Sequence, residues 1–100
     1  MLKYMILAKM TPEGTKYFKG WPASIDGVLE TFTQMGGKLI GFYACGALYD
    51  FVGIGDLPSP EVAEMYRRLV VSGGLVEAQV IRLFTKEEFD QLIEALPTEL

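Results

Sequence analysis

The chain contains no histidine, and this absence removes several kinds of chemistry at once. Histidine is the usual acid and base near neutral pH, the commonest zinc ligand and the usual haem ligand. A single cysteine, Cys45, cannot supply the cluster of thiolates that would replace it. We therefore expect no cofactor and no transition metal, and an oxygen-ligated Mg²⁺ or Ca²⁺ ion is the one exception that the composition leaves open.

Disulfides, export signals and membrane segments are missing as well. A lone cysteine cannot form a disulfide within the chain, and Lys9 breaks the apolar N-terminal run before the core of a signal peptide develops. The longest uncharged run, residues 39–49, is far shorter than the roughly 20 residues needed to span a bilayer. These features predict a cytoplasmic protein that does not enter the membrane.

Positive charge is scarce, because nine Lys and Arg stand against 13 Asp and Glu and give a net charge of −4. The basic residues form no cluster that follows a phosphate backbone, so we expect no nucleic-acid partner. Gly41 and Gly46 have the outer spacing of a phosphate-binding loop, but Ala47 and Leu48 stand where that loop needs Lys and Ser or Thr. We expect these glycines to serve turns and strand packing instead.

Apolar side chains, by contrast, are abundant and make up half of the 100 residues. A chain of this length fits one domain, residues 1–100, with a single hydrophobic core. So large an apolar share in so small a chain is unusual, since much of its surface must face water. It predicts that some apolar surface meets a partner.

Apolar runs and turn signals predict four strands and three helices. The strand-like runs are Leu2–Met10, Lys38–Ala44, residues 49–55 and residues 75–84. Helix-capping patterns begin at Ser24, Ser59 and Thr85. Residues 11–14 have the composition of a turn, and residues 15–23 that of an irregular loop.

The order βαββαβ followed by a short helix is that of an α+β, ferredoxin-like fold, with an antiparallel sheet and helices on one of its faces. The last helix is expected to turn its apolar residues inward; these are Phe89, Leu92, Ile93 and Leu96.

Both faces of the predicted sheet are apolar. Strict alternation places Met5 and Leu7 on one face of the first strand and Ile6 on the other. On the second strand it places Leu39 and Tyr43 on one face and their neighbours Ile40 and Phe42 on the other. Two helices cover only one face, so the other must be buried by another molecule or remain as a large exposed patch. A two-fold homodimer that stacks sheet on sheet is the simplest solution.

Four segments in order also carry a family resemblance. They are residues 9–14 (KMTPEG), 37–43 (GKLIGFY), 49–52 (YDFV) and the set Gly74, Val76, Arg82, Phe84 and Thr85 around the fourth strand. Together they resemble the GYD domain family, small bacterial proteins of the dimeric α/β-barrel superfamily. The resemblance implies a ferredoxin-like fold and homo-oligomeric assembly, and it implies no established reaction. The family's glycine two residues before Tyr-Asp is replaced here by Ala47.

The candidate ligand-binding residues come from three predicted segments. Tyr43, Tyr49 and Asp50 lie around the hairpin, Trp21 lies in the loop before the first helix, and Arg82 lies on the fourth strand. A tyrosine hydroxyl beside an aspartate can orient a substrate oxygen, and a carboxylate partly withdrawn from water can act as a base. The structural alternative is that the tyrosines pack on the sheet and that the two charged side chains pair with partners.

If a pocket exists, we expect it between the sheet and the loop bearing Trp21, with Tyr49 or Asp50 at its edge. Lys9, Arg67, Glu77 and Gln79 are the other polar residues considered with this group. Cys45 is expected to be a small buried side chain, because no histidine is present to activate it.

Two classes of function remain open at this point. One is a non-catalytic small-molecule or assembly module, in which the cleft between helix-free sheet faces holds a ligand or is simply packed. The other is a cofactor-independent oxygenase or isomerase, by analogy with other dimeric α/β-barrels. An enclosed polar pocket containing Asp50 or Glu77 would favour the second class, and a dry, filled sheet interface the first. The catalytic residues, if any exist, are unknown.

Overall fold

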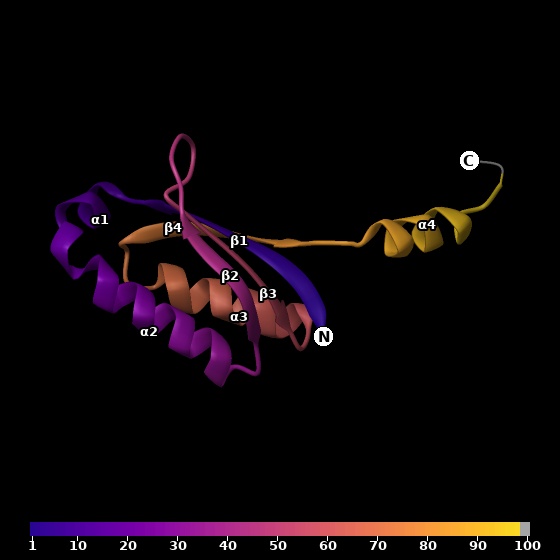
Figure 1. The fold of residues 1–100 in the computed structure, drawn as a ribbon, viewed down its shortest axis with the longest axis horizontal. Helices are drawn as coiled ribbons and strands as arrows, with labels where there is room; N and C mark the ends of the chain where they lie inside the picture. The colour runs from indigo at the N-terminus through magenta and orange to yellow at the C-terminus, as the bar shows by residue number, and fades with distance from the viewer. Residues whose placement is uncertain (99–100) are drawn as a thin grey trace.

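A four-stranded antiparallel sheet forms the centre of the computed structural model, which describes residues 1–98. Its strands are β1 (Leu2–Met10), β2 (Lys38–Ala44), β3 (Phe51–Leu57) and β4 (Val76–Arg82), in the spatial order β2-β3-β1-β4. Two helices, α2 (Trp21–Gln34) and α3 (Pro60–Val71), lie on the same face of the sheet (Figure 1). Each helix connects two strands that have a third strand between them. The predicted α+β, ferredoxin-like βαββαβ fold is confirmed.

The core lies between these helices and the sheet. Phe32, Leu57 and Tyr66 are fully buried, and the edge of one aromatic ring meets the face of the other at a centroid distance of 5.1 Å. The Tyr66 hydroxyl donates a hydrogen bond of 3.0 Å to the carbonyl of Val28, so the buried polar group is satisfied. Gly55 makes room for this packing, because a Cβ there would lie 2.7 Å from the Phe32 ring.

Residues 11–23 are helical, which corrects the predicted turn and loop. Helix α1 spans Pro12–Lys16, a 3₁₀ turn follows at Phe18–Gly20, and α2 begins at Trp21 rather than after Ser24. Pro22 lies in the first turn of α2, where its missing N–H has no helical acceptor to lose.

Contacts between distant parts of the chain hold α1 in place. The Thr11 side chain caps the helix by accepting a bond of 3.1 Å from the Gly14 N–H, while the Thr11 N–H donates to the Leu75 carbonyl at 3.0 Å. The indole N–H of Trp21 donates to the Gly14 carbonyl at 2.9 Å. A Cβ at Gly14 would lie 2.1 Å from the Leu75 oxygen, so only glycine fits. Helix α1 therefore depends on tertiary contacts that a local pattern does not contain.

Strand β2 does not alternate strictly, which corrects the predicted assignment of its faces. Its register with β3 shifts between Leu39 and Gly41, so Ile40 is the extra residue of a β-bulge. Leu39 and Phe42 consequently share the helix-facing side, where both line the space beneath α2. Tyr43 points to the opposite side.

Two strand boundaries also differ from the predicted ones. Strand β3 begins at Phe51 rather than at residue 49, so Tyr49 and Asp50 belong to the connection after β2. Strand β4 is shorter at both ends than the predicted residues 75–84.

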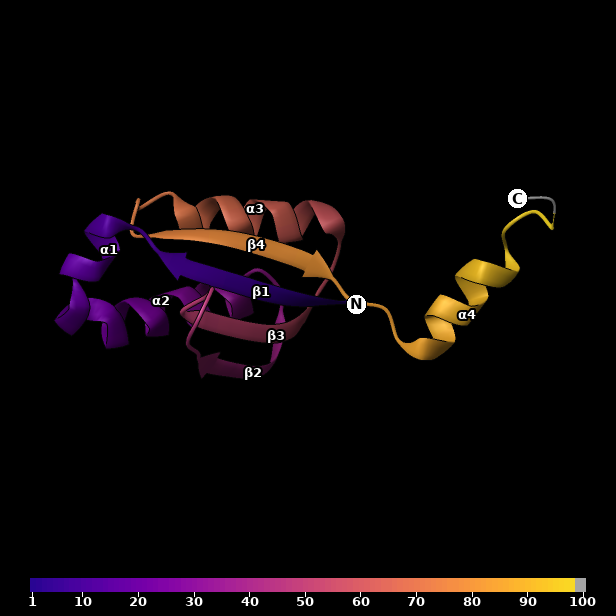
Figure 2. The same ribbon diagram turned by 90° about the horizontal axis from the view of Figure 1, so that it is seen from above.

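Helix α4 (Lys86–Glu94) begins with the predicted capping box, in which the Thr85 side chain and the Glu88 side chain each bond the other's N–H, at 3.0 and 2.9 Å. It does not fold inward as expected, because it extends away from the sheet and the other helices (Figures 1 and 2). Its apolar residues remain 48–52% exposed; these are Phe89, Leu92, Ile93 and Leu96. Among residues 1–98, no helix has the length and apolar character needed to cross a membrane.

Replacing Tyr66 with Phe tests the polar anchor of the core. At pH 7 the variant is expected to lose about 1 kcal/mol of unfolding free energy, because the bond to Val28 disappears while the ring remains. Burial raises the pKa of Tyr66 from 10.0 to about 12, so its hydroxyl stabilises the fold below pH 10 and this contribution is lost as the pH rises from 10 to about 12. Urea unfolding of both proteins should show their difference shrinking over that range.

The control is Tyr17→Phe, at an exposed tyrosine, which is expected to leave the stability at pH 7 within about 0.5 kcal/mol of the wild type. A difference between Tyr66→Phe and wild type that stays constant from pH 7 to 12 would contradict the burial argument.

Candidate functional site

The face of the sheet opposite α2 and α3 carries a band of apolar side chains, which we call the open-face band. It consists of Met5, Leu7, Val52, Ile54 and Ile81. Their neighbours along the strands line the space beneath α2, so strand alternation turns these five side chains the other way. Cross-strand pairing places them side by side across β3, β1 and β4. No helix covers them (Figure 2).

A cleft of about 390 Å³ opens at one end of this band, and we call it the Tyr49 cleft. It is lined by Leu7, Lys9, Leu48, Tyr49, Glu77, Ala78 and Gln79. The Tyr49 hydroxyl donates to the side-chain carbonyl of Gln79 at 3.3 Å, and Lys9 is the cross-strand partner of Glu77. The cleft thus combines an apolar floor with one cation, one carboxylate, one amide and one hydroxyl.

The connection between β2 and β3 forms one wall of the Tyr49 cleft. Leu48, at 75% exposure, lies on this connection and lines the cleft. Cys45 is exposed, not buried as expected, and its thiol donates to the Tyr49 carbonyl at 3.2 Å. Ala47 has a φ of 71°, the one positive φ outside glycine within residues 1–98. That conformation costs a residue with a side chain roughly 1–2 kcal/mol, which explains the glycine expected there from the family resemblance.

Asp50 serves the backbone at the base of this connection. Its carboxylate accepts a hydrogen bond of 2.7 Å from the Met10 N–H, and its own N–H donates to the Ala8 carbonyl at 2.9 Å. Its carbonyl accepts from the Cys45 N–H at 2.8 Å. Asp50 therefore ties the end of β1 to the start of β3, and it does not line the Tyr49 cleft.

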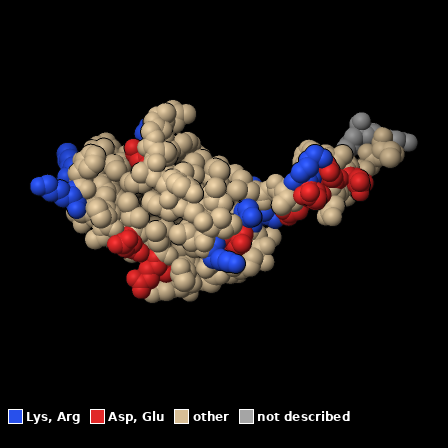
Figure 3. Space-filling model, in the orientation of Figure 1, with Lys and Arg blue, Asp and Glu red and all other residues tan. Residues whose placement is uncertain are grey.

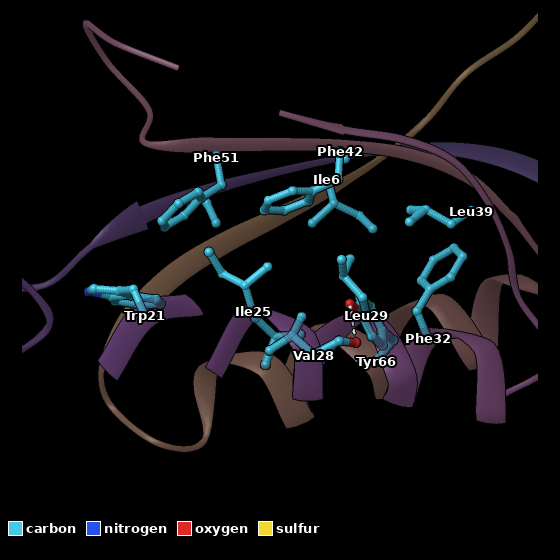
Figure 4. Close-up of a pocket in the computed structure, with 13 residues that line it drawn as sticks. Ile6, Trp21, Ile25, Val28, Leu29, Phe32, Leu39, Phe42, Phe51 and Tyr66 are labelled. Carbon is cyan, nitrogen blue, oxygen red and sulfur yellow. Dashed lines mark hydrogen bonds between the residues drawn. The ribbon is translucent and has the colours of Figure 1, made fainter. Parts of the chain in front are cut away.

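Trp21 lies on the other side of the sheet from Tyr49. Its ring packs against Phe51 at a centroid distance of 5.3 Å and borders a small apolar space of about 50 Å³ between α2 and the sheet (Figure 4). The walls of this space come from α2, α3 and the helix-facing residues of the sheet. The structure therefore does not bring Trp21 and Tyr49 together in one pocket, because the sheet lies between them.

Arg82 stands at the opposite end of β4 and is engaged within its own chain. Its guanidinium bonds the carbonyls of Lys3 and Leu83, forms an ion pair of 3.2 Å with Glu88, and stacks over Phe84 at 4.5 Å. The backbone N–H of Thr85, followed by this arginine, lowers the pKa of the Glu88 carboxyl. The expectation that Arg82 pairs with a carboxylate is confirmed.

The remaining candidates fall outside the Tyr49 cleft. Tyr43 is 62% exposed on edge strand β2, with its ring over Gly41. Arg67 pairs with Glu64 on α3 at 2.7 Å. Leu48 lines the Tyr49 cleft but was not among the residues predicted from the sequence. The sequence signal that could have found it is an apolar residue in the short connection between two strands.

A comparison with protein-family models matches residues 4–93 to the GYD domain. The chain belongs to the GYD domain family. No curated protein and no solved structure matched this GYD domain. Within the described residues 1–98, no three His, Cys, Asp or Glu side chains group in a way that would hold a metal ion.

Substitution of Asp50 by Asn tests its structural role in the GYD domain. The amide keeps an acceptor for the Met10 N–H but loses the charge, so unfolding free energy should fall by about 1 kcal/mol, and Asp50→Ala should lose about 2 kcal/mol. Chemical denaturation provides the measurement. Asp26→Asn on the exposed side of α2 is the control and should change stability by less than about 0.5 kcal/mol. Stability equal to wild type in both Asp50 variants would refute this role.

Proposed function

We propose that this GYD domain is a homodimeric small-molecule-binding module, which stacks two open faces and holds its ligand in the Tyr49 cleft. One observation carries the proposal. Helices α2 and α3 cover the same face of the sheet, and the other face keeps five neighbouring apolar side chains in contact with water. A continuous exposed apolar patch of this kind marks an interaction surface on soluble proteins.

Stacking of two such sheets would bury the open-face band of both copies. Face-to-face sheets pack about 10 Å apart, which allows side chains of the size of Met5, Leu7 and Ile54 to interdigitate. A two-fold axis would bring the same surface of each copy together, as a symmetric dimer requires. Charged residues on this face stand near the ends of the strands, where they do not interrupt the band; they are Lys3, Lys38 and Asp56 at one end and Lys9 and Glu77 at the other.

The Tyr49 cleft has the composition of a ligand site, with a few polar groups directed over apolar walls. Lys9 and Glu77 provide opposite charges, and the Tyr49–Gln79 pair provides both a donor and an acceptor. A second copy packed over the open face would narrow the opening of the Tyr49 cleft. A small polar molecule with an apolar part fits this combination of groups.

Binding is favoured over catalysis by the positions of the two carboxylates. Asp50 is occupied by the Met10 N–H and lies outside the cleft lining. Glu77 lines the cleft but is exposed, whereas reacting carboxylates generally work where water is excluded. A cofactor-independent oxygenase or isomerase has no specific support from these residues.

The dimer is tested by placing a charge in the middle of the open-face band. Val52→Asp should raise the dimer dissociation constant at least about 100-fold, because stacking would bury an unpaired carboxylate. Sedimentation velocity across a concentration series measures it. Met65→Asp introduces the same negative charge at an exposed apolar residue of α3 and should leave the dimer intact. A wild-type protein that is monomeric at micromolar concentration would remove the basis of the proposal.

Ligand binding is tested on protein purified without added ligand. Native mass spectrometry should detect a retained small molecule on wild type, and Gln79→Ala should lower its occupancy about tenfold through loss of one polar partner. Tyr49→Phe, which removes only the hydroxyl, should act in the same direction. Gln34→Ala, at an exposed residue of α2, is the control. Equal occupancy in all four proteins, or none in wild type, would contradict the assignment of the cleft.

A further inference from the structure

Helix α4 has one apolar side and one polar side, and within residues 1–98 none of its residues belongs to the buried core clusters. Four apolar side chains lie along one side of the helix axis and its C-terminal extension, at the spacing of neighbouring helical turns. They are Phe89, Leu92, Ile93 and Leu96, each about half exposed. The other side carries polar residues, including Gln91 and the Lys86–Asp90 ion pair at 2.5 Å. A helix of nine residues is too short to be stable alone in water, so this side needs a partner.

The junction between β4 and α4 directs the helix away from its own core. Only residues 83–85 separate the two elements, and each is engaged: the Leu83 N–H donates to the Lys3 carbonyl at 2.9 Å, Phe84 lies against Arg82, and Thr85 caps the helix. The Arg82–Glu88 ion pair then links the strand to the first turn of α4. Folding α4 back onto α2 and α3 would break the Arg82–Glu88 ion pair and reverse the direction that the junction gives the helix. A partner from outside the chain can cover the apolar side with the junction unchanged.

The size of the open face points to a second copy as that partner. Four strands about 4.8 Å apart and seven residues long at about 3.3 Å per residue give the sheet a footprint of only roughly 450 Å². Stable dimers bury about 800 Å² of accessible surface on each partner. An arm from each copy that packs on the other would add to the accessible surface that the stacked sheets bury.

Charge indicates where on the second copy the arm belongs. Helix α4 carries four acids and one lysine, and Figure 3 shows this mixture at the end of the molecule. Helix α2 carries only acids, at Asp26 and Glu30, and would repel it. On the open face, by contrast, Lys3 and Lys38 flank Asp56 at the end of the sheet from which α4 leaves. This basic end attracts an acidic helix.

We infer that α4 is an exchanged arm, whose apolar side packs against a second copy of this chain at the end of the sheet marked by Lys3 and Lys38. A two-fold axis that brings these ends of two copies together lets each arm cross to the other. The arm then continues the interface of the stacked open faces. The inference rests on the proposed dimer, and it adds a second, separable contact to it.

The test compares two variants of the full chain that add the same charge to opposite sides of α4. Leu92→Asp places a carboxylate in the apolar contact and should raise the dimer dissociation constant at least about 100-fold by sedimentation velocity. Gln91→Asp places it on the polar side and should leave the constant within about threefold of wild type. Both should keep the wild-type circular dichroism of the sheet and of α2 and α3, because α4 forms no part of the core.

The two proposals fail in different ways. If Val52→Asp dissociates the dimer while Leu92→Asp has the wild-type constant, the arm is refuted and the stacked sheets remain. If Leu92→Asp dissociates it while Val52→Asp does not, the arm is supported and the stacked sheets are refuted. A monomeric wild type whose α4 amides are protected from hydrogen exchange would show the arm folded on its own chain, and would overturn the inference.

Discussion

Two helices cannot cover both faces of a four-stranded sheet, and most features of this GYD domain depend on that constraint. On the covered side, Phe32 and Tyr66 meet over Gly55, where the absence of a side chain lets an aromatic ring approach the sheet. That packing fixes α2 and α3 in one layer. The apolar residues at alternate positions in β1, β3 and β4 then remain on the surface, where they form a partly exposed apolar patch.

The contacts of Asp50 and Arg82 lie at the two ends of the sheet. At one end, Asp50 joins β1 to β3 and so positions the connection that walls the Tyr49 cleft. At the other end, Arg82 joins β4, the start of β1 and the first turn of α4. The two ends thereby have different tasks in the proposed assembly, since one borders a cleft and the other orients an arm. The cleft and the helix α4 are thereby kept at opposite ends of the sheet, with the open-face band between them.

The sequence predicted what depends on local patterns. Capping residues located the starts of α3 and α4, and apolar runs bounded by turn residues located the strands, because both signals lie within a few neighbouring residues. The bulge at Ile40 was not predicted, because one extra residue cannot be recognised within a run of apolar residues. It places Leu39 on the helix-facing side of the sheet and Tyr43 on the opposite side. Helix α1 escaped because the contact between Gly14 and Leu75 joins distant segments. Tyr49, Lys9, Glu77 and Gln79 were foreseen as candidates, but the face of Lys9, Glu77 and Gln79 follows from strand register. Trp21 lies on the other side of the sheet because it belongs to α2, which packs on the covered face.

The central position of β1 has a consequence for how the chain folds. This strand is made first, yet its partners in the sheet are residues 51–57 on one edge and 76–82 on the other, with Tyr4 opposite Arg82. Contacts so distant along the chain close large loops and slow folding relative to helical proteins of this size. Until those partners are synthesised, both edges of an apolar nine-residue strand are unpaired. During synthesis β1 is thus more exposed to aggregation than any later strand of the domain.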